Sequence, residues 1–170
     1  MHGLETERLI FQEVKEADAE FICELLNEPG YITHISDRGI RTPEEAKDYI
    51  SERFVYGDDG FGFYLLRERE TGEEIGIAGT LKRDFLDHPD LGYALLRRHE
   101  GKGYAFEAAS AVLAYGLNDL ELGRVGAIVS AQNGRSIHLL KKLGLVYEKD
   151  VAYPGEEVPV QLYLNPKDEA

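Results

Sequence analysis

The sequence predicts a mixed α/β fold: a central, mostly antiparallel sheet of about seven strands, with helices on both of its faces. Two observations predict it. Runs of alternating apolar residues are interleaved with segments that have apolar residues at helical spacing, and three strand-like runs follow one another in the middle of the chain. The 170 residues fit a single domain over 1–170, because no linker, repeat or low-complexity segment divides them.

The N-terminal part of the chain predicts one strand and two helices. In order, the elements are a strand over 8–14, a helix over 15–28, a mixed loop over 31–41 and a helix over 42–54. Pro29 and Gly30 end the first helix. Thr42 is the expected N-cap of the second helix, and Glu45 completes a capping box.

The remainder of the chain adds six strands and two helices. In order, these are strands over 61–70, 73–85 and 90–97, a helix from 103 to about 117, a strand over 123–131, a helix over 133–144, and strands over 145–153 and 158–165. The turn Thr71-Gly72 predicts a hairpin, so the first three strands are expected to form an antiparallel meander. The helix between 90–97 and 123–131 predicts a parallel pairing of these two strands.

Composition limits the classes of partner. The chain has 19 Lys and Arg against 32 Asp and Glu, a formal charge of -13, which argues against nucleic acid or an anionic membrane as the main partner. The charge suits a cationic partner such as an amine, and it equally suits solubility alone. No apolar run is long enough to span a bilayer, no metal-ligand spacing is present, and Cys23 is the single cysteine, so a cytoplasmic protein is expected.

A pair of glycines in "RRHEGKGYAFEAASAVLAYG" marks the candidate site. Gly101 and Gly103 lie between a predicted strand and a predicted helix, where backbone N–H groups carry partial positive charge. Glycines leave that backbone open to a phosphate or pyrophosphate, and Arg98 and Lys102 would add charge from the side. The alternative is a turn that only lets helix and sheet pack. The spacing is neither GxGxxG nor a P-loop.

The same stretch resembles a known family signature. "RRHEGKGYAFEA" looks like motif A of the GCN5-related N-acetyltransferases (GNAT), in which Gln or Arg is followed, after two intervening residues, by Gly-x-Gly or Gly-x-Ala. "NGRSIHLLKKLGL" resembles the next motif of that family. "LETERLIFQEV" and "TPEEAKDYI" are similar to the branch that acetylates ribosomal-protein N-termini, and the resemblance covers nearly the whole chain in the family's order.

The resemblance implies acetyl-CoA as co-substrate, without a metal, bound beside a splayed pair of parallel strands. The backbone from Arg98 to Gly103 would hold the pyrophosphate, the strand before it would bind pantetheine and polarise the thioester, and Asn133 and Ser136 would lie beside the thiol. The implied cofactor-binding residues are Leu95, Leu96, Arg98, Glu100, Gly101, Lys102, Gly103, Tyr104, Asn133 and Ser136.

The catalytic groups are less marked in the sequence. Many members of the family have a tyrosine that protonates the leaving thiolate, and Leu140 stands at that position, so Ser136, with Asn133 in the same motif, is the expected substitute. Asp90 is the candidate base, and the alternative for it is a solvated carboxylate in a turn. Glu74 is equally open as a base or as a charge at the edge of the sheet. The family places the acceptor beside the loop that contains Tyr31, His34 and Arg41, and each of these also fits an ordinary loop role.

The expected function is therefore acetyl-CoA-dependent N-acetyltransfer by direct attack of a primary amine. A protein or peptide N-terminal α-amine is the favoured acceptor, and a small amine is the second. An acyl-CoA-binding sensor or accessory protein without catalysis is the alternative that the missing tyrosine favours, and a nucleotide-phosphate binder is a third. Both a monomer and a homodimer are left open.

Overall fold

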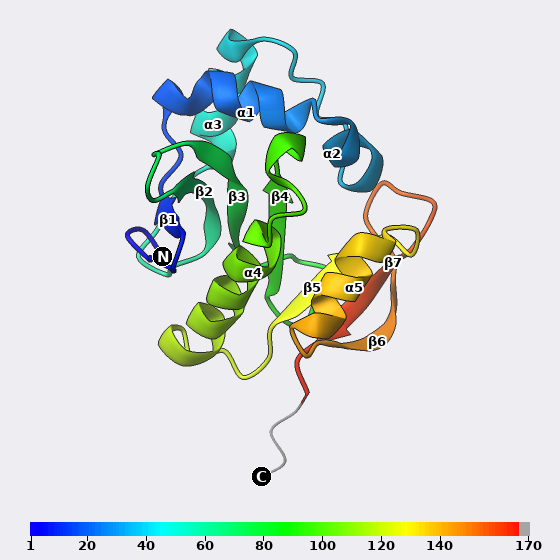
Figure 1. The fold of residues 1–170 in the computed structure, drawn as a ribbon. Helices are drawn as coiled ribbons and strands as arrows, with labels where there is room; N and C mark the ends of the chain where they lie inside the picture. Colours follow the sequence, from blue (N-terminus) through cyan, green and yellow to red (C-terminus); the bar gives the residue numbers. More distant parts are fainter. Residues whose placement is uncertain (167–170) are drawn as a thin grey trace.

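A computed structural model of the chain describes residues 1–166. Seven strands form one sheet in the order β1-β2-β3-β4-β5-β7-β6 (Figure 1). The strands are β1 (Leu9–Gln12), β2 (Gly62–Glu68), β3 (Glu74–Leu81), β4 (Asp90–Leu95), β5 (Gly126–Val129), β6 (Val146–Val151) and β7 (Val160–Leu164). The helices are α1 (Ala19–Leu26), α2 (Pro29–His34), α3 (Pro43–Arg53), α4 (Tyr104–Ala114) and α5 (Gly134–Lys142).

The pairing of the strands confirms the predicted topology. β1 to β4 are antiparallel neighbours, β5, β7 and β6 are antiparallel neighbours, and β4 with β5 is the parallel pair. The crossover from β4 to β5 contains α4, as the sequence predicted. The mixed, mostly antiparallel sheet thus divides into two antiparallel halves that meet at β4 and β5.

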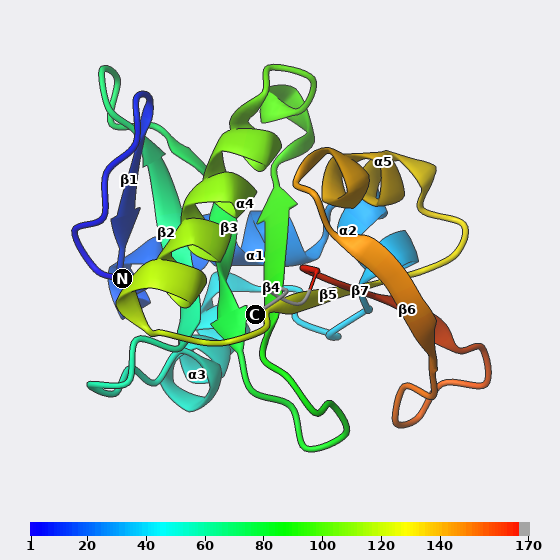
Figure 2. The ribbon, with the colours of Figure 1, turned by 90° about the horizontal axis from the view of Figure 1, so that it is seen from below.

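Helices cover both faces of the sheet, and each face has its own apolar cluster. α4 and α5 lie on one side, where Val112 and Leu140 pack with strand residues such as Leu91. α1 and α3 lie on the other side, where Leu25 and Ile50 pack against the opposite face of the strands (Figure 2). Because β4 and β5 are parallel and each is followed by a helix on the same face, the N-termini of α4 and α5 lie at the same end of the sheet.

Local signals explain most element boundaries. The capping box of α3 is present: Glu45 N–H donates to Thr42 Oγ1 at 3.2 Å, and Thr42 N–H donates to Glu45 Oε2 at 3.1 Å. The hairpin between β2 and β3 turns at Gly72, whose φ is +72°. α5 ends just before Gly144, whose φ is +84°.

Most predicted segments are shorter in the structure, and three of them show where the sequence signals mislead. The expected loop 31–41 begins inside α2, because Pro29 occupies the first turn of a helix, where its fixed φ is favourable. The strand predicted over 73–85 ends at Leu81, before the residues that leave the sheet. The helix predicted from 103 to about 117 is α-helical only to Ala114 and continues as a wider π-helical turn over Tyr115–Asp119.

Candidate functional site

The glycine turn connects β4 to α4 and presents a row of backbone donors. Gly101 and Gly103 have φ values of +73° and +86°, the left-handed region that favours glycine. Among residues 1–166, no acceptor bonds any of the six consecutive N–H groups from Gly101 to Phe106. A Cβ added at Gly101 would meet no atom within 4 Å. Six free donors at the positive end of a helix form a site for an anion.

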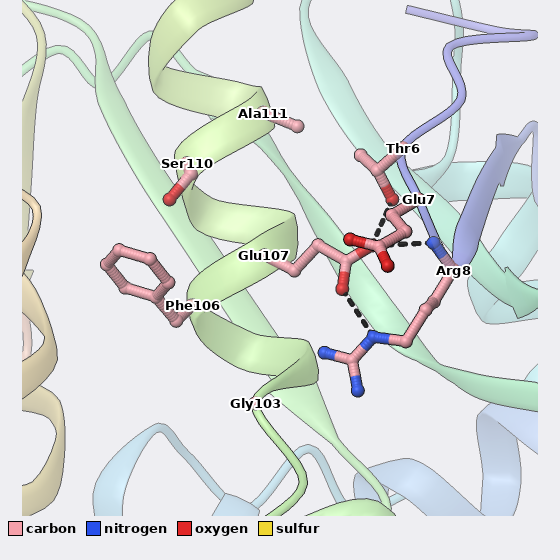
Figure 3. Close-up of a pocket in the computed structure, with 8 residues that line it drawn as sticks. All are labelled: Thr6, Glu7, Arg8, Gly103, Phe106, Glu107, Ser110 and Ala111. Atoms are coloured by element: carbon pink, nitrogen blue, oxygen red, sulfur yellow. Dashed lines mark hydrogen bonds and ion pairs between the residues drawn. The ribbon is translucent and has the colours of Figure 1, made fainter.

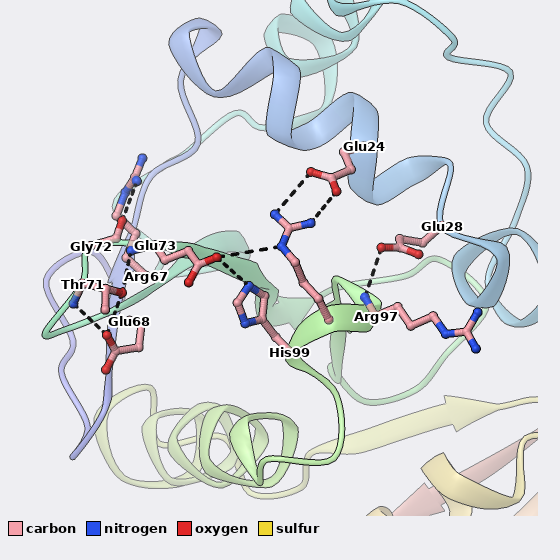
Figure 4. A network of polar contacts seen from close by, with 10 residues as sticks. Glu24, Glu28, Arg67, Glu68, Thr71, Gly72, Glu73, Arg97 and His99 are labelled. Atoms are coloured by element: carbon pink, nitrogen blue, oxygen red, sulfur yellow. Dashed lines mark hydrogen bonds and ion pairs between the residues drawn. The ribbon is translucent and has the colours of Figure 1, made fainter.

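Ion pairs and a backbone hydrogen bond hold the start of this turn against α1, the N-cap of α2 and the hairpin before β3. The Arg98 guanidinium pairs with Glu24 of α1 and lies 3.9 Å from Glu73, and the Arg97 N–H donates to Glu28 at 3.1 Å (Figure 4). Arg98 was expected to add charge beside the anion, but its charge is balanced by these carboxylates. Glu100 is likewise paired, with Arg135 of α5 at 2.7 Å.

The parallel strands β4 and β5 separate beyond their first residues. They pair only through Asp90 and Gly126, and the Gly126 N–H donates to the Pro89 carbonyl at 2.8 Å. Just after β4, the Leu96 N–H donates to the Ile75 carbonyl of β3, and hydrogen bonds alternate between the two edges of an antiparallel strand. The backbone groups of Tyr93 and Leu95 therefore face the open side of β4, which an extended ligand could use as a strand edge.

A pair of hydroxyl groups bridges β4 and the start of α5. The Tyr93 hydroxyl donates to Ser136 Oγ at 3.1 Å, and Asn133 caps α5 by accepting the Ser136 N–H at 3.2 Å. Burial raises the pKa of Tyr93 above its ordinary value, so this phenol stays protonated near neutral pH. Leu140, at the position of the missing tyrosine, is 2% exposed and belongs to the core.

Asp90 is a buried carboxylate with a single charged partner. It is 1% exposed, and both its oxygens accept from Arg83 Nε, at 2.9 and 3.0 Å. Arg83 Nη1 also donates to the Tyr153 hydroxyl at 3.3 Å. Burial raises the pKa of Asp90 to about 6, and Arg83 opposes that rise only in part. Asp90 is thus able to exchange a proton close to neutral pH.

The three residues expected near the acceptor differ in their surroundings. Tyr31 is buried in the apolar cluster between α1 and α3, and burial raises its pKa. His34 is exposed at the end of α2. Arg41 is exposed, and its Nη2 donates to both carboxylate oxygens of Asp37, at 2.9 and 2.7 Å. The structure does not bring these three side chains together in one polar cluster.

A shallow groove of about 580 Å³ lies on the side of α4 that faces the N-terminal segment. Figure 3 shows its lining: Thr6, Glu7, Arg8, Gly103, Phe106, Glu107, Ser110 and Ala111. Glu107 accepts from Arg8 Nε at 2.7 Å and from Thr6 Oγ1 at 2.6 Å. The groove thus places Arg8 directly beside Gly103.

Sequence reasoning missed Arg8, Arg83 and Tyr93 at this site. Each is placed by a partner distant in sequence: Glu107 is 99 residues from Arg8, Tyr153 is 70 from Arg83, and Ser136 is 43 from Tyr93. Tyr93 alone carried a signal, because it lies on the strand that precedes the glycine turn.

Over residues 1–166 no group of three or more His, Cys, Asp or Glu side chains is arranged to hold a metal ion. No helix within the same range is both long and apolar enough to cross a membrane.

Comparison with known proteins gives consistent matches. The family model described as "Acetyltransferase (GNAT) domain" matches residues 8–146. The uncharacterized N-acetyltransferase p20 of Bacillus licheniformis is 31% identical over 150 residues, which cover 87% of this chain and 84% of p20.

Two solved structures share the fold at low identity. One is RimL, titled a ribosomal L7/L12 alpha-N-protein acetyltransferase in complex with coenzyme A, with a TM-score of 0.80, 14% identity and 99% of each chain covered. The other is a spermidine N-acetyltransferase from Vibrio cholerae in complex with CoA and spermine, with a TM-score of 0.75, 17% identity, and 94% and 95% of the two chains covered.

Proposed function

Because the chain belongs to the GNAT acetyltransferase family, we propose that it moves an acetyl group from acetyl-CoA to a primary amine, and that the preferred amine is the α-amine of a protein or peptide N-terminus. The single observation that carries the proposal is the row of six free N–H groups from Gly101 to Phe106. These donors, at the start of α4, fit a pyrophosphate.

The residues around the turn fit the rest of coenzyme A. The open backbone edge of Tyr93 and Leu95 leads from the turn along β4 and suits the amide groups of pantetheine. Asn133 and Ser136, at the start of α5, would flank the thiol end. Bound acetyl-CoA supplies an acetyl group that is activated as a thioester.

The hydroxyl pair is the proposed proton donor on the leaving-group side. Because Tyr93 donates to Ser136 Oγ, the Ser136 hydroxyl proton is free to point toward a thiolate. The raised pKa of Tyr93 keeps the phenol protonated, so the pair can act by hydrogen bonding. The pair would thus take the role of proton donor that a tyrosine at position 140 has in many members of the family.

The proposed base, Asp90, favours an α-amine over a lysine or polyamine nitrogen. A base whose pKa is about 6 can remove a proton from an amine of pKa about 8 far more readily than from one of about 10.4. The two structural neighbours act on different amines by their names: RimL on a protein α-amine and the Vibrio cholerae enzyme on spermidine. The protonation argument is therefore what separates them for this chain.

Titration calorimetry tests the donor site first. We expect acetyl-CoA and coenzyme A to bind and ATP not to bind, because the proposed site matches pantetheine as well as phosphate. The acceptor is then tested by thiol release from acetyl-CoA with a panel of peptides that have free N-termini, matched N-blocked peptides, and spermidine. Release with free peptides alone supports the proposal. Release with spermidine alone refutes the acceptor class, and binding without any release favours an accessory protein.

A further inference from the structure

We infer that Arg8 is a positioning residue for the coenzyme A site: its guanidinium fixes the peptide between Lys102 and Gly103, so that the Gly103 N–H points toward the bound anion. This inference rests on the proposed function, since it assigns the glycine turn to coenzyme A. Arg8 lies just before β1, 94 residues before Lys102 of the glycine turn.

Arg8 is held across the start of α4 by several contacts (Figure 3). Its Nη1 donates to the Lys102 carbonyl at 2.8 Å, its Nε donates to Glu107 Oε2 at 2.7 Å, and its backbone N–H donates to Glu107 Oε1 at 2.8 Å. Its guanidinium carbon lies 4.5 Å from the centre of the Tyr104 ring. A Cβ built on Gly103 would be 3.2 Å from Arg8 Nη2. The side chain therefore spans the turn and its first helical residues.

The geometry of a trans peptide converts this contact into an orientation. No peptide bond in residues 1–166 is cis, and in a planar trans peptide the C=O and the following N–H point in opposite directions. With the Lys102 carbonyl directed at Arg8, the Gly103 N–H is directed away from it. This N–H is the third of the six free donors and lies in the middle of the row.

Gly103 leaves this peptide weakly restrained against flipping. Rotation of the 102–103 peptide changes φ of Gly103, and glycine accepts both signs of φ at little cost. Because Gly103 has no Cβ, a phosphate can reach the backbone, but the 102–103 peptide is also freer to rotate. The Arg8 hydrogen bond supplies the restraint that glycine lacks.

The charge of Arg8 is already balanced, which favours positioning over direct binding. Burial alone would raise the pKa of Glu107, but hydrogen bonds from Thr6 and Arg8 outweigh it and hold that pKa below its ordinary value. Glu107 is thus ionised at neutral pH beside Arg8. Two of the three guanidinium nitrogens, Nε and Nη1, are engaged within the protein.

Substitution of Arg8 separates positioning from simple charge. Arg8→Met keeps an unbranched chain over Tyr104 but donates no hydrogen bond. Arg8→Lys keeps the charge but lacks the fork that reaches two acceptors. The matched control is Arg69→Met, because Arg69 also contacts the N-terminal segment, through the Thr6 carbonyl at 2.9 Å and Glu5 at 3.3 Å, but not the turn.

The measurements are the coenzyme A dissociation constant by calorimetry and the Gly103 amide resonance in the ligand-free protein. If the binding-competent peptide orientation falls to about one tenth of the population, the dissociation constant rises about tenfold. We expect this for Arg8→Met, a rise of at least about fivefold for Arg8→Lys, and less than twofold for Arg69→Met. The Gly103 amide should show microsecond to millisecond exchange in the Arg8 variants only, a readout that a purely structural role would not change.

Each outcome decides the question. Wild-type affinity in Arg8→Met, with coenzyme A bound by the parent protein, refutes the positioning role and leaves the proposed function intact. Wild-type affinity in Arg8→Lys alone assigns the effect to charge and also refutes it. Failure of the parent protein to bind coenzyme A refutes the proposed function itself. If a thermal melt shows that Arg8→Met is not folded, the binding measurement on Arg8→Lys decides the question.

Discussion

Replacing Asp90 with asparagine should change how the stability of the protein depends on pH. Asp90 is 1% exposed, and burial raises its pKa from 3.8 to about 6. Between these two values the folded state binds more protons than the unfolded state, so the free energy of unfolding falls as the pH rises. Asp90→Asn removes this titration while conserving shape. The loss of charge beside Arg83 adds an offset that does not vary with pH in this range.

The size of the effect follows from the two pKa values. At about 1.4 kcal/mol for each pKa unit, the whole difference corresponds to about 3 kcal/mol. Integrating the difference in bound protons between the folded and unfolded states gives a decrease of about 1 kcal/mol between pH 5 and pH 7. The unfolding free energy of the parent protein minus that of Asp90→Asn should therefore decrease by about 1 kcal/mol from pH 5 to pH 7.

Denaturant unfolding of both proteins at several pH values measures this difference. Asp84→Asn is the control for the loss of a carboxylate, because Asp84 is exposed in the same loop as Arg83. A constant difference between the parent and Asp90→Asn would refute the raised pKa, and with it the protonation argument for the acceptor. In the thiol-release assay, Asp90→Asn should lower kcat about a hundredfold or more if Asp90 is the base.

Three further substitutions test other parts of the site. Gly103→Glu should abolish coenzyme A binding in calorimetry and lower the free energy of unfolding by about 1–2 kcal/mol. The control is Gly155→Glu, at a φ of +85° in an exposed loop, which should lose similar stability and still bind coenzyme A. Retained binding in Gly103→Glu would contradict the anion site. Tyr93→Phe should lower kcat about tenfold without changing the dissociation constant, and an unchanged kcat would remove the hydroxyl pair from catalysis. Leu140→Ala should lower the free energy of unfolding by about 2–5 kcal/mol, and a loss below 1 kcal/mol would contradict its role in the core.

The regular elements could be predicted because their signals are local. The apolar spacing of α4, the capping box at Thr42 and the hairpin glycine Gly72 each depend on residues within a few positions, and the structure confirms all three elements. α2 was missed because a six-residue helix gives too little periodicity to recognise. The site residues named from the motifs stay predictions until coenzyme A binding is measured.

By itself, the sequence determined the order of the strands and of the helices other than α2, the parallel crossover between β4 and β5, and the glycine turn that starts α4. Those features depend on the spacing of neighbouring residues. Only the tertiary structure decided which side chains meet: Arg8 with Lys102 and Glu107, Tyr93 with Ser136, and Arg83 with Asp90. The last pair is close in sequence, but Asp90 is buried only because its strand, β4, lies in the middle of the folded sheet. Burial and long-range contact are properties of the packed chain, and no local pattern encodes them.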